Sequence, residues 1–316
     1  MKTLVSILTF ATLIVTLLSP LTSSADECLA TMTRGKYRGQ CIDTAHKRAI
    51  RILDRTAETI TIANYRKNGR FYKAVIPFND VTQMSYVIVD LNATPLNSIA
   101  QVHVSHTELR FHFNKGAGVE LYDLDQPISE QSFAGTDEDF LISLNYMAPK
   151  GVPYDPVKGL DGNLFASALQ VLSLSEEVDI RFQQEEKFNV YEITLDIPSD
   201  QAALVLKTAL FFSNNVQYTI PYDSWNSNCT TVLFDILDAG LRLKGQKPYR
   251  FSVLKVHDTG MVSAFRALGQ RHLVHDETSI QSVNAEFGYG LFPSKSNRHF
   301  AKFIGKTYRE IKWSLL

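Results

Sequence analysis

The residue of this sequence best suited to nucleophilic chemistry is Cys229, in the run Asn228-Cys229-Thr230-Thr231. Apolar residues recur after it, over residues 233–240, at the i, i+3, i+4, i+7 spacing of a buried helix face. The thiol is therefore expected in the first turn of a helix that Asn228 or Thr230 could cap. Unpaired backbone N–H groups and the helix dipole favour the thiolate there, which is the reactive form. The same spacing also fits a buried structural cysteine.

A general base for this thiol is available in His106, on a segment with strand-like alternation over residues 101–113. The alternation predicts that His106, Glu108 and Arg110 share one face of the strand. A glycine-rich turn over residues 115–118 predicts that residues 119–124 return as the partner strand of a hairpin. That hairpin would bring Asp123 or Glu120 within reach of the imidazole, where a carboxylate would hold its tautomer and orientation. The pattern leaves the choice between the two carboxylates open.

Composition excludes several classes of function. The chain has 316 residues, is 45% hydrophobic and carries a formal net charge of −1. This is enough for one large domain or two modest ones. Near-neutral charge without a long basic run argues against nucleic-acid binding. No zinc-ligand spacing and no phosphate-loop or dinucleotide fingerprint occurs, so we expect neither a metal nor a cofactor.

The N-terminus predicts export. Lys2 precedes an apolar run over residues 4–18, and small residues offer a cleavage point near Ala25, as in a secretory signal. A retained membrane anchor is less expected, because the run is short for a spanning helix and is followed by Pro20. In an oxidising compartment Cys28 and Cys41 are the economical disulfide pair. Cys229 is then the unpaired thiol, which favours a chemical role for it.

Several further elements follow from patterning. Asn68-Gly69 between two alternating runs predicts a hairpin, and residues 125–163 are turn-rich and predict a long loop or lid. Tyr146 and Tyr154 lie in that segment and could line a substrate groove, although half-buried loop aromatics are common. The other predicted elements are helices over residues 43–53 and 201–212, strands over 86–91, 189–197 and 251–256, and a basic amphipathic segment over 296–311 that could touch a membrane.

Two motifs, taken in order, resemble the Lnb-type N-terminal periplasmic domain family of bacteria. They are Ser105-His106-Thr107-Glu108-Leu109-Arg110 and Asn228-Cys229-Thr230-Thr231. The strand-like residues 191–195, followed by a helix, and the stretch 218–222 leading to the cysteine also look like that family. The resemblance covers residues 100–245. We therefore divide the chain into a signal peptide (1–25), a β-rich N-terminal extension (26–99), this domain (100–245) and a C-terminal extension (246–316).

The resemblance implies an α+β fold with a circularly permuted papain-like core, as in enzymes of the NlpC and lecithin:retinol acyltransferase type. Such a core has an antiparallel sheet and a helix that carries the nucleophile. The site residues implied are Cys229 as nucleophile, His106 as base, Asp123 as third member with Glu120 as second choice, and Asn228, Thr230 and Arg110 in oxyanion or supporting roles.

Family members with a membrane extension are lipoprotein N-acyltransferases, which move a phospholipid acyl chain through a thioester. The resemblance thus implies a periplasmic cysteine-dependent acyltransferase or hydrolase with a lipid or lipoprotein acyl substrate and peripheral membrane contact. Two departures leave the acceptor open: Ser105 replaces the commoner Gly, and no long apolar run follows the domain. The alternatives are a cell-wall peptide amidase or cysteine peptidase, and a non-catalytic binding protein with the same fold.

Overall fold

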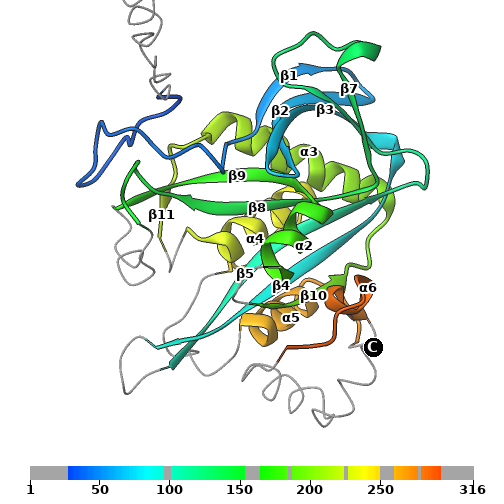
Figure 1. Cartoon of the computed structure of the whole chain (residues 1–316). Coiled ribbons are helices and arrows are strands. Elements are labelled where there is room, and N and C mark those ends of the chain that lie inside the picture. Colours follow the sequence, from blue (N-terminus) through cyan, green and yellow to red (C-terminus); the bar gives the residue numbers. More distant parts are fainter. Residues whose placement is uncertain are drawn as a thin grey trace, which may run out of the picture.

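A computed structural model describes residues 28–95, 101–153, 164–183, 187–223, 227–249, 260–276 and 279–292. The fold is mixed α/β, built on one large, mostly antiparallel open sheet with helices on both faces (Figure 1). Along the sheet the strand order is β12-β10-β4-β5-β8-β9-β2-β3-β6-β7, while β1 pairs with β2 and β11 with β9. Only the β2–β9 pair is parallel among these described ladders.

The bounds of the elements are as follows. The strands are β1 (Arg51–Arg55), β2 (Thr59–Lys67), β3 (Arg70–Pro77), β4 (Val81–Pro95), β5 (Gln101–Phe113), β6 (Val119–Asp123), β7 (Phe133–Asp137), β8 (Asp139–Met147), β9 (Phe165–Ser173), β10 (Asn189–Thr194), β11 (Pro221–Tyr222) and β12 (Ile280–Ser282). The helices are α2 (Leu174–Phe182), α3 (Ser199–Val216), α4 (Cys229–Gly240), α5 (Gly260–Gly269) and α6 (Val283–Glu286), with short 3-10 turns at Phe78–Asp80 and Glu130–Ser132.

The hairpin expected at Asn68-Gly69 is confirmed as the β2–β3 turn. Lys67 pairs with Arg70, and both turn residues have positive φ, 49° at Asn68 and 72° at Gly69. Such a two-residue turn needs positive φ at both positions, which Asn and Gly tolerate best. The helix expected over residues 201–212 is confirmed as α3, and the strands expected over 86–91 and 189–197 lie in β4 and at β10.

The sheet has two differently covered faces. Leu109 and Phe111 of β5 enter the main core with α3, α4 and α5, while α2 and the start of α6 cover the opposite face around Val87 and Leu141. Figure 1 shows α2 in front of the sheet and α3 and α4 behind it. The alternation along β5 therefore sends Glu108 towards the α2 side, as expected from a period of two.

The hairpin expected between residues 101–113 and 119–124 is wrong. β6 pairs with β3 and β7, while β5 pairs with β4 and β8. The strand β8 comes from the segment expected to be a long loop, and that expectation is wrong as well. Residues 139–147 alternate too weakly to reveal a strand, because five consecutive positions from Phe140 to Leu144 are all buried.

The N-terminal segment also differs from its prediction. The helix expected over residues 43–53 is wrong: Arg51–Arg55 forms β1 against β2, and the preceding Ala49 and Ile50 pack into the interior. The Cys28–Cys41 disulfide is confirmed. It closes an N-terminal lobe in which Met32 and Ile42 pack against the end of β8 and the start of β9. The signal, Tyr154 and the elements expected over 251–256 and 296–311 lie outside the described residues.

Gly240 sets the approach of α3 to α4. A Cβ added there would lie 2.8 Å from the Val205 Cα and 3.0 Å from Cγ2. Gly240→Ala is therefore expected to force the helices apart and lower the free energy of unfolding by about 1–3 kcal/mol. Gly269→Ala is the control, because nothing lies within 4 Å of its added Cβ. Urea titration of both variants checks this, and equal midpoints would contradict it.

Candidate active site

Cys229 is the first residue of α4, in the position that the sequence predicts. Asn228 caps the helix: its Oδ1 accepts hydrogen bonds from the backbone N–H groups of Thr230 at 2.9 Å and Thr231 at 3.0 Å. The Thr231 hydroxyl in turn accepts from the Asn228 N–H at 3.0 Å, which completes a capping box. The side-chain oxygen of Asn228 thus fixes the first turn of α4. The Cys229 thiol therefore has a defined position at the positive end of the helix.

The hydroxyl of Thr230 joins α4 to β5. It accepts a hydrogen bond from the Thr107 hydroxyl at 3.3 Å and lies 4.0 Å from the Cys229 sulfur. Thr107 itself also hydrogen-bonds the sulfur through its backbone and side chain. The helix α4 is therefore anchored on the residue next to His106.

His106 reaches the thiol where two strands separate. The β5–β8 ladder runs from His112 to Leu109 and ends there. Beyond that point Ser143 of β8 turns its Oγ to within 2.6 Å of His106 Nε2. Glu108 Oε1 lies 3.4 Å from the same nitrogen. Because Ser143 and Glu108 occupy the Nε2 side, Nδ1 is the nitrogen left for the Cys229 thiol.

The charge state of the thiol follows from this neighbour. Burial opposes ionisation of Cys229, but the positive charge and hydrogen bond of His106, together with Thr107, lower its pKa to about 7. A thiol with such a pKa is substantially thiolate at neutral pH. The structure thus brings together the two residues that the sequence singled out, although their catalytic roles stay a prediction.

Cys229 is only 6% exposed, yet it lines a cavity of about 580 Å³. Tyr146, expected as a possible groove residue, forms part of this wall beside Tyr222. Lys47 places its Nζ 3.8 Å from the Tyr146 ring centroid, and burial, with Arg181 and Arg66 nearby, lowers its pKa to about 8. The apolar part of the lining consists of Leu91, Leu144, Leu172 and Ile180.

Two buried carboxylates and a guanidinium line the same cavity as His106. Burial raises the pKa of Glu108 to about 7, against the opposing effects of Arg181 and a hydrogen bond from Ser143. The same cause raises the pKa of Glu177 to about 7, and Arg181 again opposes it. Arg181 is paired directly with Glu177 one helical turn away on α2. The second oxygen of Glu108, Oε2, has no hydrogen-bond partner.

The carboxylates expected as third member do not approach His106. β6 is separated from β5 by β8, β9, β2 and β3 in the sheet order. Asp123 instead pairs with exposed Arg70 at 3.6 Å, and Glu120 accepts a hydrogen bond from Tyr122 at 2.7 Å. The expected neighbourhood is wrong because the connection after β5 crosses the sheet rather than turning back on it.

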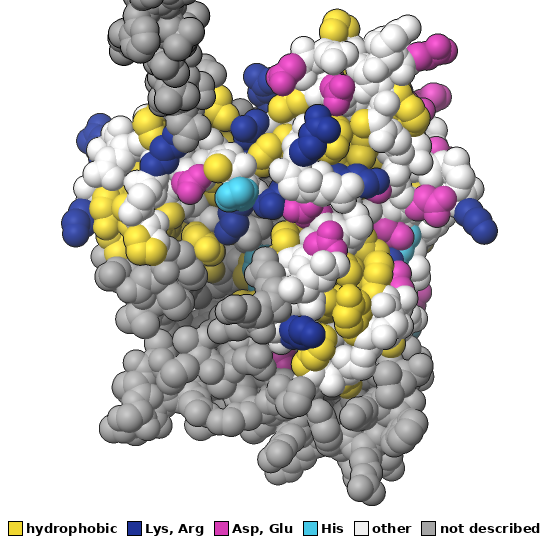
Figure 2. Space-filling model, in the orientation of Figure 1, with side chains coloured by type: hydrophobic (Ala, Val, Ile, Leu, Met, Phe, Trp, Pro, Cys, Tyr) yellow, Lys and Arg dark blue, Asp and Glu magenta, His cyan; other side chains and the backbone are white. Residues whose placement is uncertain are grey.

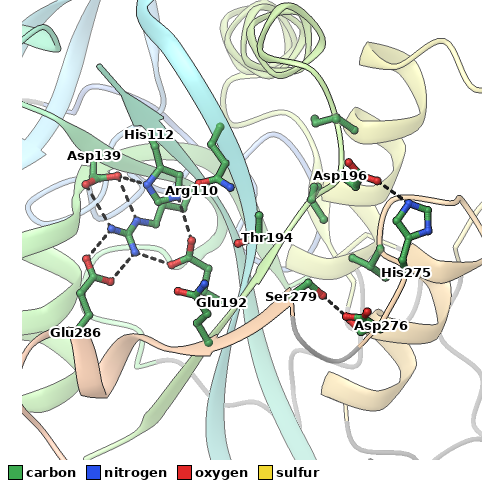
Figure 3. Close-up of a pocket in the computed structure, with 15 residues that line it drawn as sticks. Arg110, His112, Asp139, Glu192, Thr194, Asp196, His275, Asp276, Ser279 and Glu286 are labelled. Carbon is green, nitrogen blue, oxygen red and sulfur yellow. Dashed lines mark hydrogen bonds and ion pairs between the residues drawn. The ribbon is translucent and has the colours of Figure 1, made fainter. Parts of the chain in front are cut away.

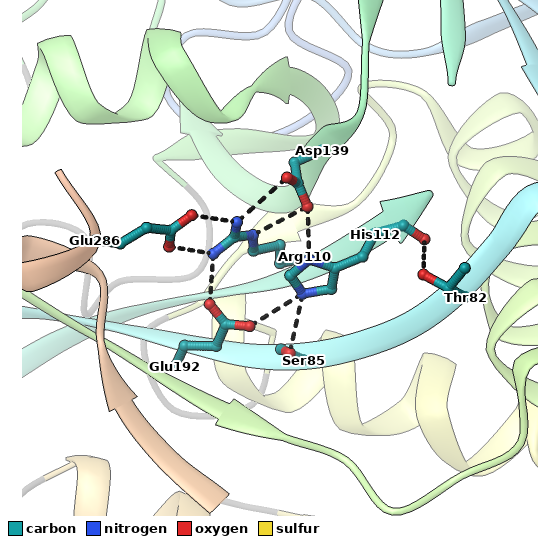
Figure 4. Close-up of polar contacts among 7 residues, drawn as sticks. All are labelled: Thr82, Ser85, Arg110, His112, Asp139, Glu192 and Glu286. Atoms are coloured by element: carbon teal, nitrogen blue, oxygen red, sulfur yellow. Dashed lines mark hydrogen bonds and ion pairs between the residues drawn. The ribbon is translucent and has the colours of Figure 1, made fainter. Parts of the chain in front are cut away.

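Arg110 is held away from the thiol by three carboxylates (Figure 4). Its Nη1 lies 2.6 Å from Glu192 and 2.8 Å from Glu286, and its Nη2 lies 3.3 Å from Asp139. These partners come from β10, α6 and β8. The guanidinium is 4% exposed, so it joins four elements across the sheet rather than lining the cavity with Cys229.

His112 completes this network. Its Nδ1 lies 2.6 Å from Asp139 and its Nε2 lies 3.0 Å from Glu192. Burial opposes protonation, but these two carboxylates raise the pKa of His112 to about 9. Figure 3 shows the group on the wall of a second cavity, of about 840 Å³, that is separate from Cys229. The sequence pattern gives no sign of this role of His112.

Sequence reasoning missed four residues around the thiol: Ser143, Glu177, Arg181 and Lys47. A signal existed for two of them, because Glu177 and Arg181 stand at i, i+4 spacing, which suits an ion pair on a helix. Within the described ranges, no group of three or more His, Cys, Asp or Glu side chains could hold a metal ion. None of the helices in those ranges combines the length and apolar character needed to cross a membrane.

Comparison with known proteins agrees with the two motifs. Residues 76–257 match the family described as the Lnb N-terminal periplasmic domain. No curated protein and no solved structure gives a significant match. The matched region contains β4, β5, β8, β10 and α4, and with them both His106 and Cys229. It spans more than half of the chain, and we conclude that this protein belongs to the family of Lnb N-terminal periplasmic domains.

Proposed function

We propose that this protein is a periplasmic cysteine-dependent acyltransferase or hydrolase that works through a thioester on Cys229. The observation that carries the proposal is the contact between the Cys229 thiol and His106 in the wall of a cavity, with the pKa of the thiol lowered, against the effect of burial, to about 7. A buried structural cysteine would have a raised pKa and would not need a histidine beside it. We also propose that the fold contains a circularly permuted papain-like core, and the packing of α4 beside the strand that carries His106 supports this proposal.

In the proposed reaction His106 takes the proton of Cys229, and the thiolate attacks the acyl carbonyl carbon. Backbone N–H groups in the first turn of α4 stabilise the oxyanion. The ester C–O bond breaks as His106 returns the proton to the leaving oxygen, which leaves the acyl group as a thioester. An amine or water then attacks the thioester carbonyl, gives up its proton to His106 and releases the thiol.

A lipid acyl group fits the lining of the cavity. Leucine and isoleucine side chains offer apolar contact beside the thiol, while Lys47 and Arg66 offer positive charge in the same wall. On the face seen in Figure 2, Lys and Arg side chains gather mainly over the N-terminal lobe and β2–β3, next to that cavity. Such a surface suits peripheral contact with anionic lipid. We also propose export by the N-terminal signal, with cleavage near Ala25.

Intact-mass analysis tests this function. Wild-type protein and Cys229→Ser are incubated with a phospholipid extract and, separately, with purified cell-wall fragments. We expect the mass of the wild type to increase by that of a fatty-acyl group, and we expect hydroxylamine to remove this group because it cleaves thioesters. Cys229→Ser should show no adduct that hydroxylamine removes in this way. Release of wall peptides without an acyl adduct would favour the amidase or peptidase, and no product in either arm would favour a binding protein.

A further inference from the structure

The groups on the far side of His106 have no role in the steps above, although they are buried beside the reacting pair. Glu108 is 1% exposed, and its Oε1 is 3.4 Å from His106 Nε2. Its other oxygen is buried without a partner. Such an unsatisfied buried carboxylate costs free energy, so a functional reason is expected for it.

We propose that Glu108 is a positioning residue for His106, which holds the imidazole through Nε2 and stabilises its protonated form, and that Arg181 and Glu177 of α2 set the charge of Glu108. This inference rests on the proposed function, which gives the positioned His106 its role in catalysis. Its test is independent of catalysis, because it measures the reactivity of the Cys229 thiol. In this proposal Glu108, on the same strand as His106, takes the role of third member that the sequence suggested for Asp123 or Glu120.

The hydrogen bonds have a consistent direction. His106 Nε2–H donates to Ser143 Oγ, and the Ser143 hydroxyl then donates to Glu108, with the Thr107 carbonyl at 3.5 Å as a weaker acceptor. This arrangement keeps the proton on Nε2 and leaves Nδ1 free to accept the proton of Cys229. A negative charge on Glu108 favours the imidazolium that results, and the imidazolium in turn favours the thiolate.

One guanidinium serves two acids at this place. Glu108, Glu177 and Arg181 line the same cavity, and Arg181 pairs with Glu177. Burial raises the pKa of both acids, Glu108 further raises that of Glu177, and Arg181 lowers the pKa of both. The other charged or titratable groups that line this cavity are His46, Lys47, Arg66, His106, Tyr146, Tyr222 and Cys229. Two buried carboxylates with a single paired cation retain a proton near neutral pH, so that Glu177 competes with Glu108 for Arg181.

The experiment measures the rate of Cys229 alkylation by iodoacetamide from pH 5 to pH 9, followed by intact mass. Because the pKa of Glu108 is about 7, its negative charge is present mainly above pH 7. Glu108→Gln should therefore lower the rate by about threefold between pH 7 and pH 8, as for an upward shift of about one unit in the thiol pKa, and should leave the rates at pH 5 and pH 9 within about twofold. Glu177→Gln should shift the profile to lower pH. With Glu177 neutral, Arg181 stabilises only the Glu108 anion, which in turn favours the imidazolium of His106 and the thiolate of Cys229.

Glu176→Gln is the matched control. Glu176 is equally buried on α2 but pairs with Arg66 at 2.8 Å, away from His106. A merely structural role of Glu108 would lower the rate at every pH or give the same change in Glu176→Gln, and either result would overturn the proposal. A shift of Glu177→Gln in the direction of Glu108→Gln would overturn the competition for Arg181.

The two proposals can fail separately. If no acyl-enzyme forms but Glu108→Gln shifts the alkylation profile, the positioning role stands and the acyl chemistry fails. If the acyl-enzyme forms and the profile of Glu108→Gln equals that of the wild type, the chemistry stands and the positioning role fails.

Discussion

Cys229→Ala is expected to lower kcat/KM for a p-nitrophenyl acyl ester by about 10⁴-fold or more, because removal of the nucleophile leaves only binding and oxyanion stabilisation. His106→Ala should cost nearly as much, and the double variant little more than either single one. Residues that act as one unit show this lack of additivity. The rate of p-nitrophenolate release is measured at saturating and at limiting ester concentrations, which separates kcat from KM.

Ala239→Ser is a suitable control for this series, because Ala239 lies on the exposed side of the same helix. It should keep the wild-type rate and the wild-type unfolding midpoint. Near-normal turnover in Cys229→Ala would show that the reaction does not pass through this thiol. Additive losses in the double variant would show that His106 acts apart from it.

The second large effect is expected on stability. Arg110→Met should lower the free energy of unfolding by about 3 kcal/mol, because it removes the guanidinium from buried Glu192 and leaves His112 as the cation beside it. Glu286 and Asp139 would lose the same partner, although both are more exposed. Urea unfolding followed by circular dichroism measures the loss. Arg70→Met is the matched control, since the 69% exposed Arg70 pairs with Asp123 at 3.6 Å, and such pairs contribute less than about 1 kcal/mol.

The pH dependence of the Arg110 network follows from two of its members. Burial opposes ionisation of Glu192, but His112 and Arg110 lower its pKa from 4.5 to about 2. Its contribution to stability is therefore present above pH 4.5 and is lost as the pH falls towards 2. His112 has its pKa raised from 6.5 to about 9, so its contribution is present below pH 6.5 and is lost as the pH rises through 9.

Arg110→Met should accordingly lose stability at a higher pH on the acid side than the wild type, because one of the groups that keep Glu192 ionised is gone. If Arg110→Met and Arg70→Met unfold at the same urea concentration across this range, the buried network does not stabilise the fold as described.

Local patterns were enough for the elements whose signals are local. The Asn228 cap, the apolar spacing of α4 and the alternation of β5 predicted the place of Cys229 and the face shared by His106 and Glu108. Turn chemistry at Asn68-Gly69 likewise predicted the β2–β3 hairpin. In each case the controlling interactions lie within a few residues of each other along the chain.

The third partner of His106 could not be found in this way. Neighbouring stretches of sequence favoured a β5–β6 hairpin, and with it Asp123, but strand pairing is decided by long-range burial. β8 is a nearly continuous buried run and takes the place beside β5, which brings Ser143 to the imidazole. The charged groups of α2 reach the site only because that helix packs over the same face of the sheet.

The sequence by itself thus determined which thiol and which histidine are proposed as nucleophile and base, and the local structure that presents each of them, because caps, turns and periodicity act over short distances. Only the tertiary structure decided which carboxylate stands behind the base, that Arg110 belongs to a separate ion-pair network, and which side chains line the cavity. Those choices depend on the order of strands in the sheet, and that order is set by the combined burial of segments far apart in the chain.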